Sequence, residues 1–131
     1  MPRVRLTRLE LQLMDILWDL GEAAVREVQE AIPLKSRPAY TTVQTILNRL
    51  EEKGAVKKLR KIGNAWIFSP AINRKKTHER LIDDFLDLFG GSATPVVSHL
   101  LESGKVTLDD LRAIEERLQQ TASSEKKKRK E

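Results

Sequence analysis

The order of the periodic segments most constrains how this chain can fold: three short amphipathic helices come first, and a tight hairpin follows within the first 70 residues. The first helix begins after Thr7, because Thr7 and Glu10 have the spacing of a capping box, and Gly21 is a residue type that ends helices. The second helix covers roughly residues 24–32 and is closed by Pro33. Apolar side chains recur at helical spacing in both segments.

The third helix, residues 40–53, has an apolar side and an unusual polar side. Its apolar positions, Val43, Ile46, Leu47 and Leu50, follow the i, i+3, i+4, i+7 pattern. The other side carries short or fork-shaped polar groups that can donate to phosphates and base edges. These are Thr41, Thr42, Gln44, Thr45, Asn48 and Arg49. A solvated face is the alternative, but threonine loses rotamer freedom in a helix, so we favour contact with DNA.

The hairpin, residues 56–69, adds positive charge beside this helix. Gly63-Asn64 is a turn pair between two short strands, and Pro70 ends the second strand. Lys57, Lys58, Arg60, Lys61 and Asn64 surround the turn, and no acidic residue lies between Lys53 and Lys76. Lysines on an edge strand also oppose aggregation, but here the cations reach the loop tip. The order of elements is that of a winged helix-turn-helix with a two-stranded wing, although the imperfect alternation leaves the strand register open.

The second half of the chain changes in charge and in apolar content. Residues 1–70 carry a surplus of four positive charges, residues 71–122 a surplus of two negative charges, and residues 123–131 a surplus of three positive charges. Helices are predicted from residue 74 to 89, from 95 to 102 and after Thr107, with more apolar surface than one small domain could hide. We therefore predict a mainly α protein with a DNA-binding domain at 1–70, a helical domain at 71–121 whose surplus apolar surface needs a partner, and a basic disordered tail at 122–131.

The residue types present exclude several kinds of protein. Cysteine is absent, which excludes disulfides, thiolate metal sites and cysteine nucleophiles. The apolar runs are far shorter than the ~20 residues of a membrane-spanning helix, and no leader opens the chain, so we expect a cytoplasmic protein. His78 with Glu79, Asp83 and Asp84 lacks the ligand spacing of a zinc site, and no catalytic motif is present. We expect no enzymatic activity, no metal and no cofactor.

Four segments are similar to the signature segments of one known family. They are Leu6–Glu10 with Met14–Trp18, Ala39–Gly54, Phe68–Pro70 and Phe89–Ser92. The second of them matches the family's recognition helix and is the most specific. On these segments the chain resembles the BlaI/MecI/CopY family of bacterial repressors, also called penicillinase repressors, over roughly residues 6–120.

The resemblance implies a homodimeric repressor in which each winged-helix module binds one half of a dyad operator. It implies that Thr41, Thr42, Gln44, Thr45, Asn48 and Arg49 face the DNA groove, and that Lys58, Arg60, Lys61 and Asn64 hold the DNA backbone. The C-terminal helices would interlock, which agrees with their surplus of apolar side chains. The expected interface residues are Leu81, Phe85, Leu88, Phe89, Val97, Leu100, Leu101, Leu111, Ile114 and Leu118.

Two departures from the family's pattern bear on how repression is relieved. Copper-responsive members carry a cysteine-rich metal site, which this chain lacks. The β-lactam branch is inactivated when a membrane sensor metalloprotease cuts an Asn-Phe bond in the dimerisation region. The corresponding bond here joins His99 and Leu100, so cleavage and the inducing signal stay open.

Two other functions fit parts of the sequence. A winged-helix module that binds proteins and never touches DNA is favoured by the acidic middle segment and disfavoured by the basic hairpin. A ligand-sensing repressor of the multiple-antibiotic-resistance type would need a pocket with polar groups that orient a ligand. No such groups stand near Phe85, Leu88 and Phe89.

Overall fold

The computed structural model of the chain describes residues 5–130, with side chains as far as residue 124. The chain divides into two compact units, one ending at Leu81 and the other beginning at Ile82. The sequence places this boundary earlier, between residues 70 and 71. The first unit extends further because Arg74 and His78, at the start of a new helix, contact Asp15 in the first helix.

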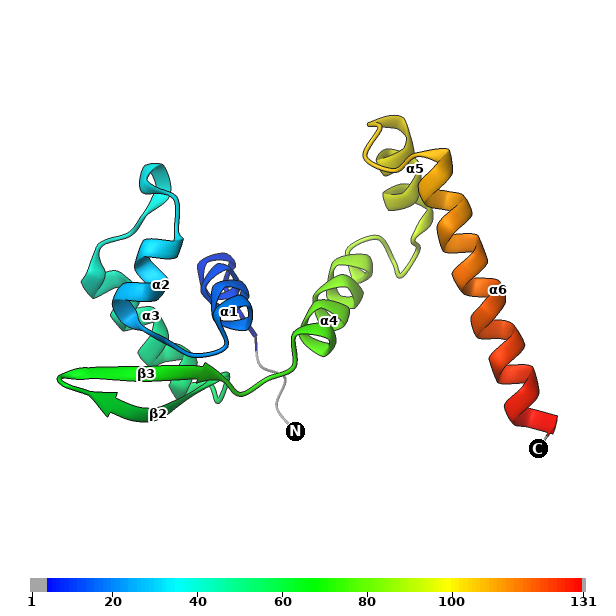
Figure 1. The fold of residues 1–131 in the computed structure, drawn as a ribbon. Helices are drawn as coiled ribbons and strands as arrows, with labels where there is room; N and C mark the ends of the chain where they lie inside the picture. Colours follow the sequence, from blue (N-terminus) through cyan, green and yellow to red (C-terminus); the bar gives the residue numbers. More distant parts are fainter. Residues whose placement is uncertain (1–4, 131) are drawn as a thin grey trace. The chain divides into compact units, whose positions relative to one another are not determined.

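The first unit has the element order of a winged helix-turn-helix (Figure 1). Its elements are α1 (Arg8–Leu20), β1 (Ala23–Ala24), α2 (Val25–Ala31), a 3-10 turn (Leu34–Ser36), α3 (Tyr40–Glu52), β2 (Val56–Ile62) and β3 (Ala65–Pro70). The strands pair antiparallel in the order β1-β3-β2, and α1, α2 and α3 lie on one side of the sheet. The predicted wing had two strands. The structure adds β1, whose two residues are too few to show any periodicity in the sequence.

The core of the first unit lies between the three helices and the sheet. The apolar positions predicted in α3 are all buried, and α1 buries Leu13, Met14 and Leu17. The largest fully buried side chains are Leu13, Met14, Leu17, Val28, Ile32, Val43, Leu47, Leu50 and Phe68. Burial of this apolar side holds α3 in one orientation, so its polar side must face outward.

The predicted start of α1 is confirmed in detail. The Glu10 backbone N–H donates to the Thr7 hydroxyl oxygen at 3.2 Å, and the Thr7 N–H donates to the Glu10 carboxylate at 2.9 Å. Gly21 ends the helix with a φ of 81°, a conformation that L side chains rarely adopt. The same reciprocal pair, Thr107 and Asp110, begins the last helix.

Glu10 also joins the start of α1 to the end of α3. It is only 3% exposed, and its carboxylate accepts a hydrogen bond of 2.6 Å from the Lys53 ammonium group. Burial alone would raise the pKa of Glu10, but the hydrogen bonds from Lys53 and Thr7 outweigh it, so this pKa lies below its ordinary value of 4.5. The charged carboxylate is therefore the form that the folded chain favours.

We expect Glu10→Gln to lower the free energy of unfolding near neutral pH by about 1–3 kcal/mol, because it removes a charge-assisted hydrogen bond in a buried setting. The pKa of Glu10 is lowered on folding, so its contribution is complete above the unfolded pKa and is lost as the pH falls through the folded pKa. Urea unfolding at roughly pH 6 and roughly pH 3 measures this. The wild type should lose more stability than Glu10→Gln over that interval; an equal loss in both would contradict the assignment.

A bulge in the hairpin explains its imperfect alternation. Lys58 pairs with Phe68 and Arg60 with Ile67, so Leu59 is the extra residue and the register shifts there. The turn is the predicted Gly63-Asn64 pair, with a φ of +63° at Gly63. This is the positive φ that a type II′ turn requires at its first central residue.

The second unit is built from helices whose described side chains are all at least partly exposed. It contains the end of α4 (Arg74–Asp87), then α5 (Thr94–Glu102) and α6 (Leu108–Lys130). No side chain of α4 or α5 is buried. The backbone of α6 continues to Lys130, although the composition of residues 122–131 predicts disorder, since Lys, Glu and Gln favour propagation of a helix that has already begun. None of the helices within residues 5–130 is long and apolar enough to cross a membrane.

Candidate nucleic-acid interface

The six polar residues predicted on the outer side of α3 are all exposed. Between them, Val43, Ile46, Leu47 and Leu50 are buried, so the two sides of the helix are sharply different. The Thr45 hydroxyl donates to the Thr41 carbonyl oxygen at 2.9 Å. Its oxygen keeps its lone pairs, so Thr45 can still accept a hydrogen bond and offer its methyl group. The face therefore presents donors, acceptors and methyl groups, the chemistry by which base edges are distinguished.

The segment before α3 is held by side chains that the sequence analysis did not single out. The Arg37 guanidinium donates to the backbone carbonyls of Ile32 and Glu30, both at 2.9 Å. The Gln29 amide donates to the Pro38 carbonyl oxygen at 3.1 Å. These contacts fix how the chain turns from α2 into α3. The guanidinium of Arg37, a cation close to the candidate interface, is therefore already hydrogen-bonded within the protein.

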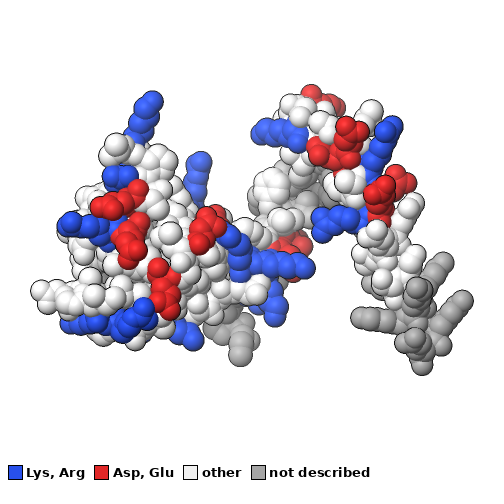
Figure 2. Space-filling view, in the orientation of Figure 1, with Lys and Arg blue, Asp and Glu red and all other residues white. Residues whose placement is uncertain are grey.

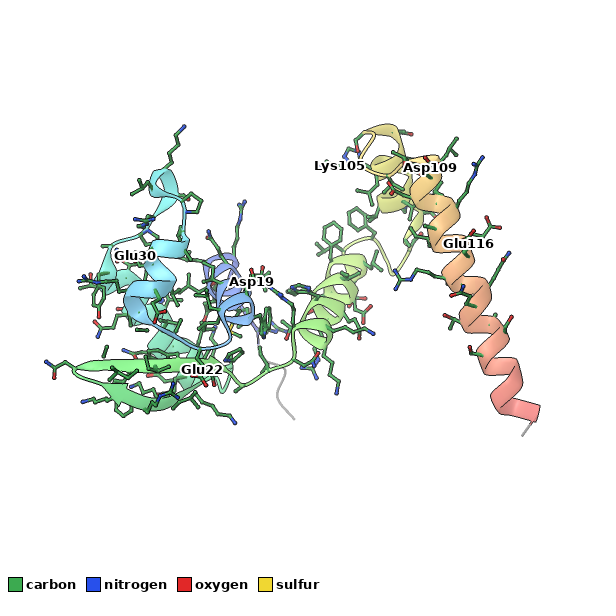
Figure 3. The ribbon with its side chains drawn as sticks, in the orientation of Figure 1. Asp19, Glu22, Glu30, Lys105, Asp109 and Glu116 are labelled. Atoms are coloured by element: carbon green, nitrogen blue, oxygen red, sulfur yellow. The ribbon has the colours of Figure 1, made fainter. Side chains whose placement is uncertain are left out.

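Two of the predicted wing cations already have acidic partners. The Arg60 guanidinium lies 2.7 Å from the Glu22 carboxylate, which precedes β1 (Figure 3), and the Lys58 ammonium lies 3.7 Å from the Glu51 carboxylate in α3. Lys57, Lys61 and Asn64 are exposed. Figure 2 shows the lysine and arginine side chains gathered along the hairpin. Phosphate contacts from Arg60 and Lys58 would therefore replace contacts within the protein, whereas Lys61 is more readily available.

Both tryptophans lie in apolar periodic runs of the sequence, which favour core packing over stacking on a base, and Trp66 departs from this expectation. Trp18 packs against the core, and its indole N–H donates to the Ile72 carbonyl oxygen at 3.0 Å. Trp66 is instead 38% exposed on β3. The ammonium groups of Lys58 and Lys61 lie 5.3 Å and 5.1 Å from the centre of its ring. The hairpin therefore presents an aromatic ring with two ammonium groups close to it.

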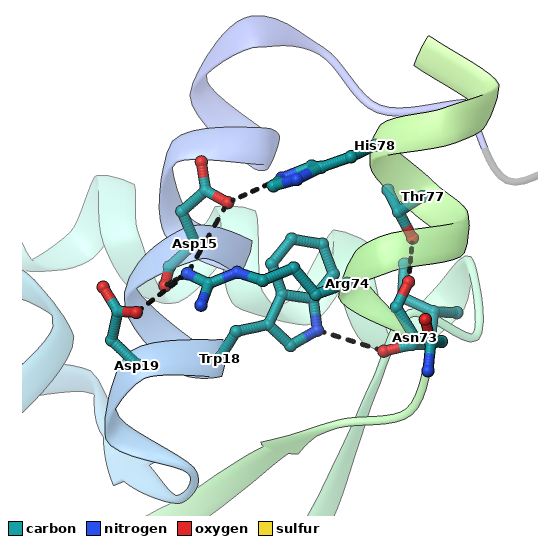
Figure 4. A network of polar contacts seen from close by, with 8 residues as sticks. Asp15, Trp18, Asp19, Asn73, Arg74, Thr77 and His78 are labelled. Carbon is teal, nitrogen blue, oxygen red and sulfur yellow. Dashed lines mark hydrogen bonds and ion pairs between the residues drawn. The ribbon is translucent and has the colours of Figure 1, made fainter. Parts of the chain in front are cut away.

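His78 takes part in a polar network at the start of α4 (Figure 4). Its Nε2 lies 3.2 Å from an Asp15 carboxylate oxygen, and its ring meets Trp18 edge-on with centroids 5.6 Å apart. Arg74 donates to the Asp15 carbonyl oxygen at 2.9 Å and to the Asp19 carboxylate at 2.8 Å. Among the described side chains, no three histidine or acidic groups are placed to hold a metal ion. The network attaches the first turns of α4 to α1.

The predicted interface residues of the second half are mostly exposed apolar side chains. Leu88 is 79% exposed, and the Phe85 and Phe89 rings contact each other edge-on with centroids 5.2 Å apart. Leu81, Leu100 and Leu111 are half-buried, and Val97, Leu101, Ile114 and Leu118 are exposed. The single chain leaves this apolar surface in water, which is costly for side chains of this size.

The predicted cleavage position lies inside a helix. His99 is exposed and Leu100 half-buried, both within α5. The His99 carbonyl oxygen accepts from the Ser103 N–H at 2.9 Å, and the Leu100 carbonyl oxygen accepts from the Lys105 N–H at 3.1 Å. A protease would have to unwind this part of α5 to reach the bond.

Several known proteins are similar in sequence to this chain over most of its length. A transcriptional regulator BlaI of Mycobacterium tuberculosis is 36% identical over 101 residues, which are 75% of this chain and 72% of that protein. A penicillinase repressor of Bacillus licheniformis is 25% identical over 118 residues, 89% of this chain and 91% of that protein. The solution structure of the DNA-binding domain of the repressor BlaI is 28% identical, with a TM-score of 0.49, and the match covers 56% of this chain and 90% of that domain.

The family resemblance carried by the four sequence segments is confirmed over most of the chain. The model of the penicillinase repressor family matches residues 6–120. This range contains α1 through α5 and the first half of α6, and so includes both the helix-turn-helix unit and the apolar helices. The chain belongs to the penicillinase repressor family.

Proposed function

We propose that this chain is a transcriptional repressor that binds double-stranded operator DNA through α3 and the wing. The observation that carries the proposal is the two-sided character of α3: Val43, Ile46, Leu47 and Leu50 are buried in the core, while the six predicted contact residues all face solvent. A recognition helix needs this combination, since it must be held rigidly and still offer hydrogen-bonding groups to a groove. The names of the relatives, a transcriptional regulator and a penicillinase repressor, support the same function.

In this proposal the wing contributes contacts to the DNA backbone. Lys61 and Asn64 lie at or near the tip and are exposed, so they can reach phosphates without breaking an ion pair within the protein. Arg60 and Lys58 would exchange their carboxylate partners for phosphates. Contacts of this kind position a protein on DNA but do not read its sequence.

The proposal includes a homodimer. The exposed apolar side chains of α4, α5 and α6 require cover, and a second copy of the same surface would provide it with two-fold symmetry. Two-fold symmetry would place two copies of α3 on the two halves of a dyad operator. Release by cleavage of the His99–Leu100 bond stays a prediction, and it would require α5 to unwind locally.

Substitutions in α3 and in the wing should have different effects. We expect Gln44→Ala and Asn48→Ala each to weaken binding to the specific site by about 1–3 kcal/mol, the usual value of one hydrogen-bonded base contact, with little effect on random DNA. Lys61→Ala should weaken binding to both duplexes similarly, because phosphates are the same in every sequence. Fluorescence anisotropy measures this, with one labelled duplex from upstream of the chain's own gene and one of random sequence.

Lys105→Ala is the matched control, since it removes one exposed positive charge from the second unit (Figure 3). It should bind both duplexes as the wild type does. Equal losses of affinity on both duplexes for the α3 variants would contradict the groove contacts. A folded wild type that binds neither duplex would instead favour a protein-interaction module.

A further inference from the structure

Trp66 is the exposed aromatic residue of the wing. It lies two residues before Phe68 on β3, so both side chains point to the same face of the strand. Phe68 is 1% exposed within the core, whereas Trp66 is 38% exposed. The apolar face of the strand therefore continues from the core onto the exposed wing, where the tryptophan is only partly covered.

One lysine connects this ring to the candidate recognition helix. The Lys58 ammonium group lies 3.7 Å from the Glu51 carboxylate in α3 and 5.3 Å from the centre of the Trp66 ring. Lys58 therefore links the Trp66 ring to the last turn of α3. Lys61, paired with Trp66 across the two strands, places its ammonium 5.1 Å from the same ring.

The arrangement combines the two chemistries that the DNA backbone offers. A deoxyribose is apolar on its carbon faces, and an aromatic ring can pack against it. The flanking phosphates are anionic and attract ammonium groups. A ring with two lysine ammonium groups nearby thus matches a sugar with its two flanking phosphates. Desolvation of the exposed part of the indole would add a hydrophobic contribution to binding.

We propose that Trp66 is a DNA-contacting residue, with its ring packed on a deoxyribose of the duplex backbone and Lys58 and Lys61 directed to the neighbouring phosphates. The inference rests on the proposed function and adds to it a contact that carries no base information. It predicts a contribution to affinity that is the same for specific and random DNA.

The chain provides its own spectroscopic control, because Trp66 and Trp18 are its two tryptophans. Trp66→Phe leaves Trp18 as the fluorophore, and Trp18 is hydrogen-bonded to Ile72 and packed against the core. On addition of the upstream duplex, the wild type should change its tryptophan emission and become about twofold less accessible to acrylamide, because the duplex backbone would cover the exposed part of the ring. Trp66→Phe should bind the duplex and show neither change.

Affinity gives a second measure. Trp66→Ala should weaken binding to the upstream and the random duplex alike, by about tenfold, and Trp66→Phe should recover most of the affinity, because it keeps an aromatic ring. Leu20→Ala is the matched control: it truncates an exposed apolar side chain at the end of α1 and should bind as the wild type does. Circular dichroism tests whether each variant is folded. If Trp66→Ala is unfolded, the fluorescence of the wild type compared with that of Trp66→Phe tests the contact instead.

The possible failures are distinguishable. A folded wild type that binds neither duplex overturns the proposed function and this inference with it. A wild type that binds DNA with unchanged tryptophan emission, together with Trp66→Ala of wild-type affinity, overturns the inference alone. The ring would then serve only to cover the lysine side chains. A decrease in affinity restricted to the specific duplex would show that Trp66 contacts bases, and would overturn the assignment to the sugar.

Discussion

Raising the salt concentration from roughly 50 to roughly 200 mM is expected to weaken operator binding by about 10³- to 10⁵-fold, if the dimer contacts about 6–10 phosphates. The physical reason is the release of counterions from the duplex when lysine and arginine neutralise its phosphates. The wing supplies Lys57, Lys58, Arg60 and Lys61, and a dimer would present them twice. An anisotropy titration at several salt concentrations gives the slope of the logarithm of the binding constant against the logarithm of the salt concentration.

The structure makes this slope sensitive to particular residues. Lys61→Ala would remove one phosphate contact from each copy. The slope should therefore become shallower by about 1 for each subunit. Lys105→Ala should leave the slope unchanged. Affinity that is independent of salt would contradict backbone contact by the wing, and the proposed mode of DNA binding with it.

The double substitution Phe85→Glu with Leu88→Glu is expected to convert the proposed dimer into a folded monomer. Both side chains are exposed apolar residues of the second unit in the single chain. Burying two carboxylates in their place would destabilise the interface more than its remaining apolar contacts stabilise it, because charges are strongly disfavoured in an apolar interface. Sedimentation equilibrium measures the molecular mass, which should fall from that of two chains to that of one.

The same variant should bind its operator about 10²- to 10⁴-fold more weakly, since two linked half-sites no longer act together. The core of the first unit contains neither residue, so its cooperative unfolding and its weak binding to random DNA should persist. Asp83→Ala is the control, because it changes an exposed polar residue of α4, the helix that contains Phe85. A double variant that stays dimeric would place the interface on another surface.

Much of the candidate site was predictable because it depends on residues that are near one another in the sequence. The capping box at Thr7 and Glu10, the buried and exposed sides of α3, and the Gly63-Asn64 turn all follow from spacings of a few residues. Local sequence determines helix ends, helix faces and tight turns, since the atoms that decide them belong to the same segment.

The remaining features of the site could not be predicted, because each depends on a partner far away in the sequence. Arg60 and Glu22 are 38 residues apart, Lys53 and Glu10 are 43 apart, and His78 and Asp15 are 63 apart. The short strand β1 forms only by pairing with β3, which lies far later in the chain.

The sequence by itself determined the helices, the wing turn and the polar face of α3, since periodicity and capping are local properties of a chain. Only the tertiary structure decided which wing cations are already paired, that Trp66 remains exposed on the wing, and how the first turns of α4 are attached to α1. The physical reason is that charge pairing and burial depend on distances in space. A linear pattern shows which side chains are available for contact, and the fold determines which of them meet.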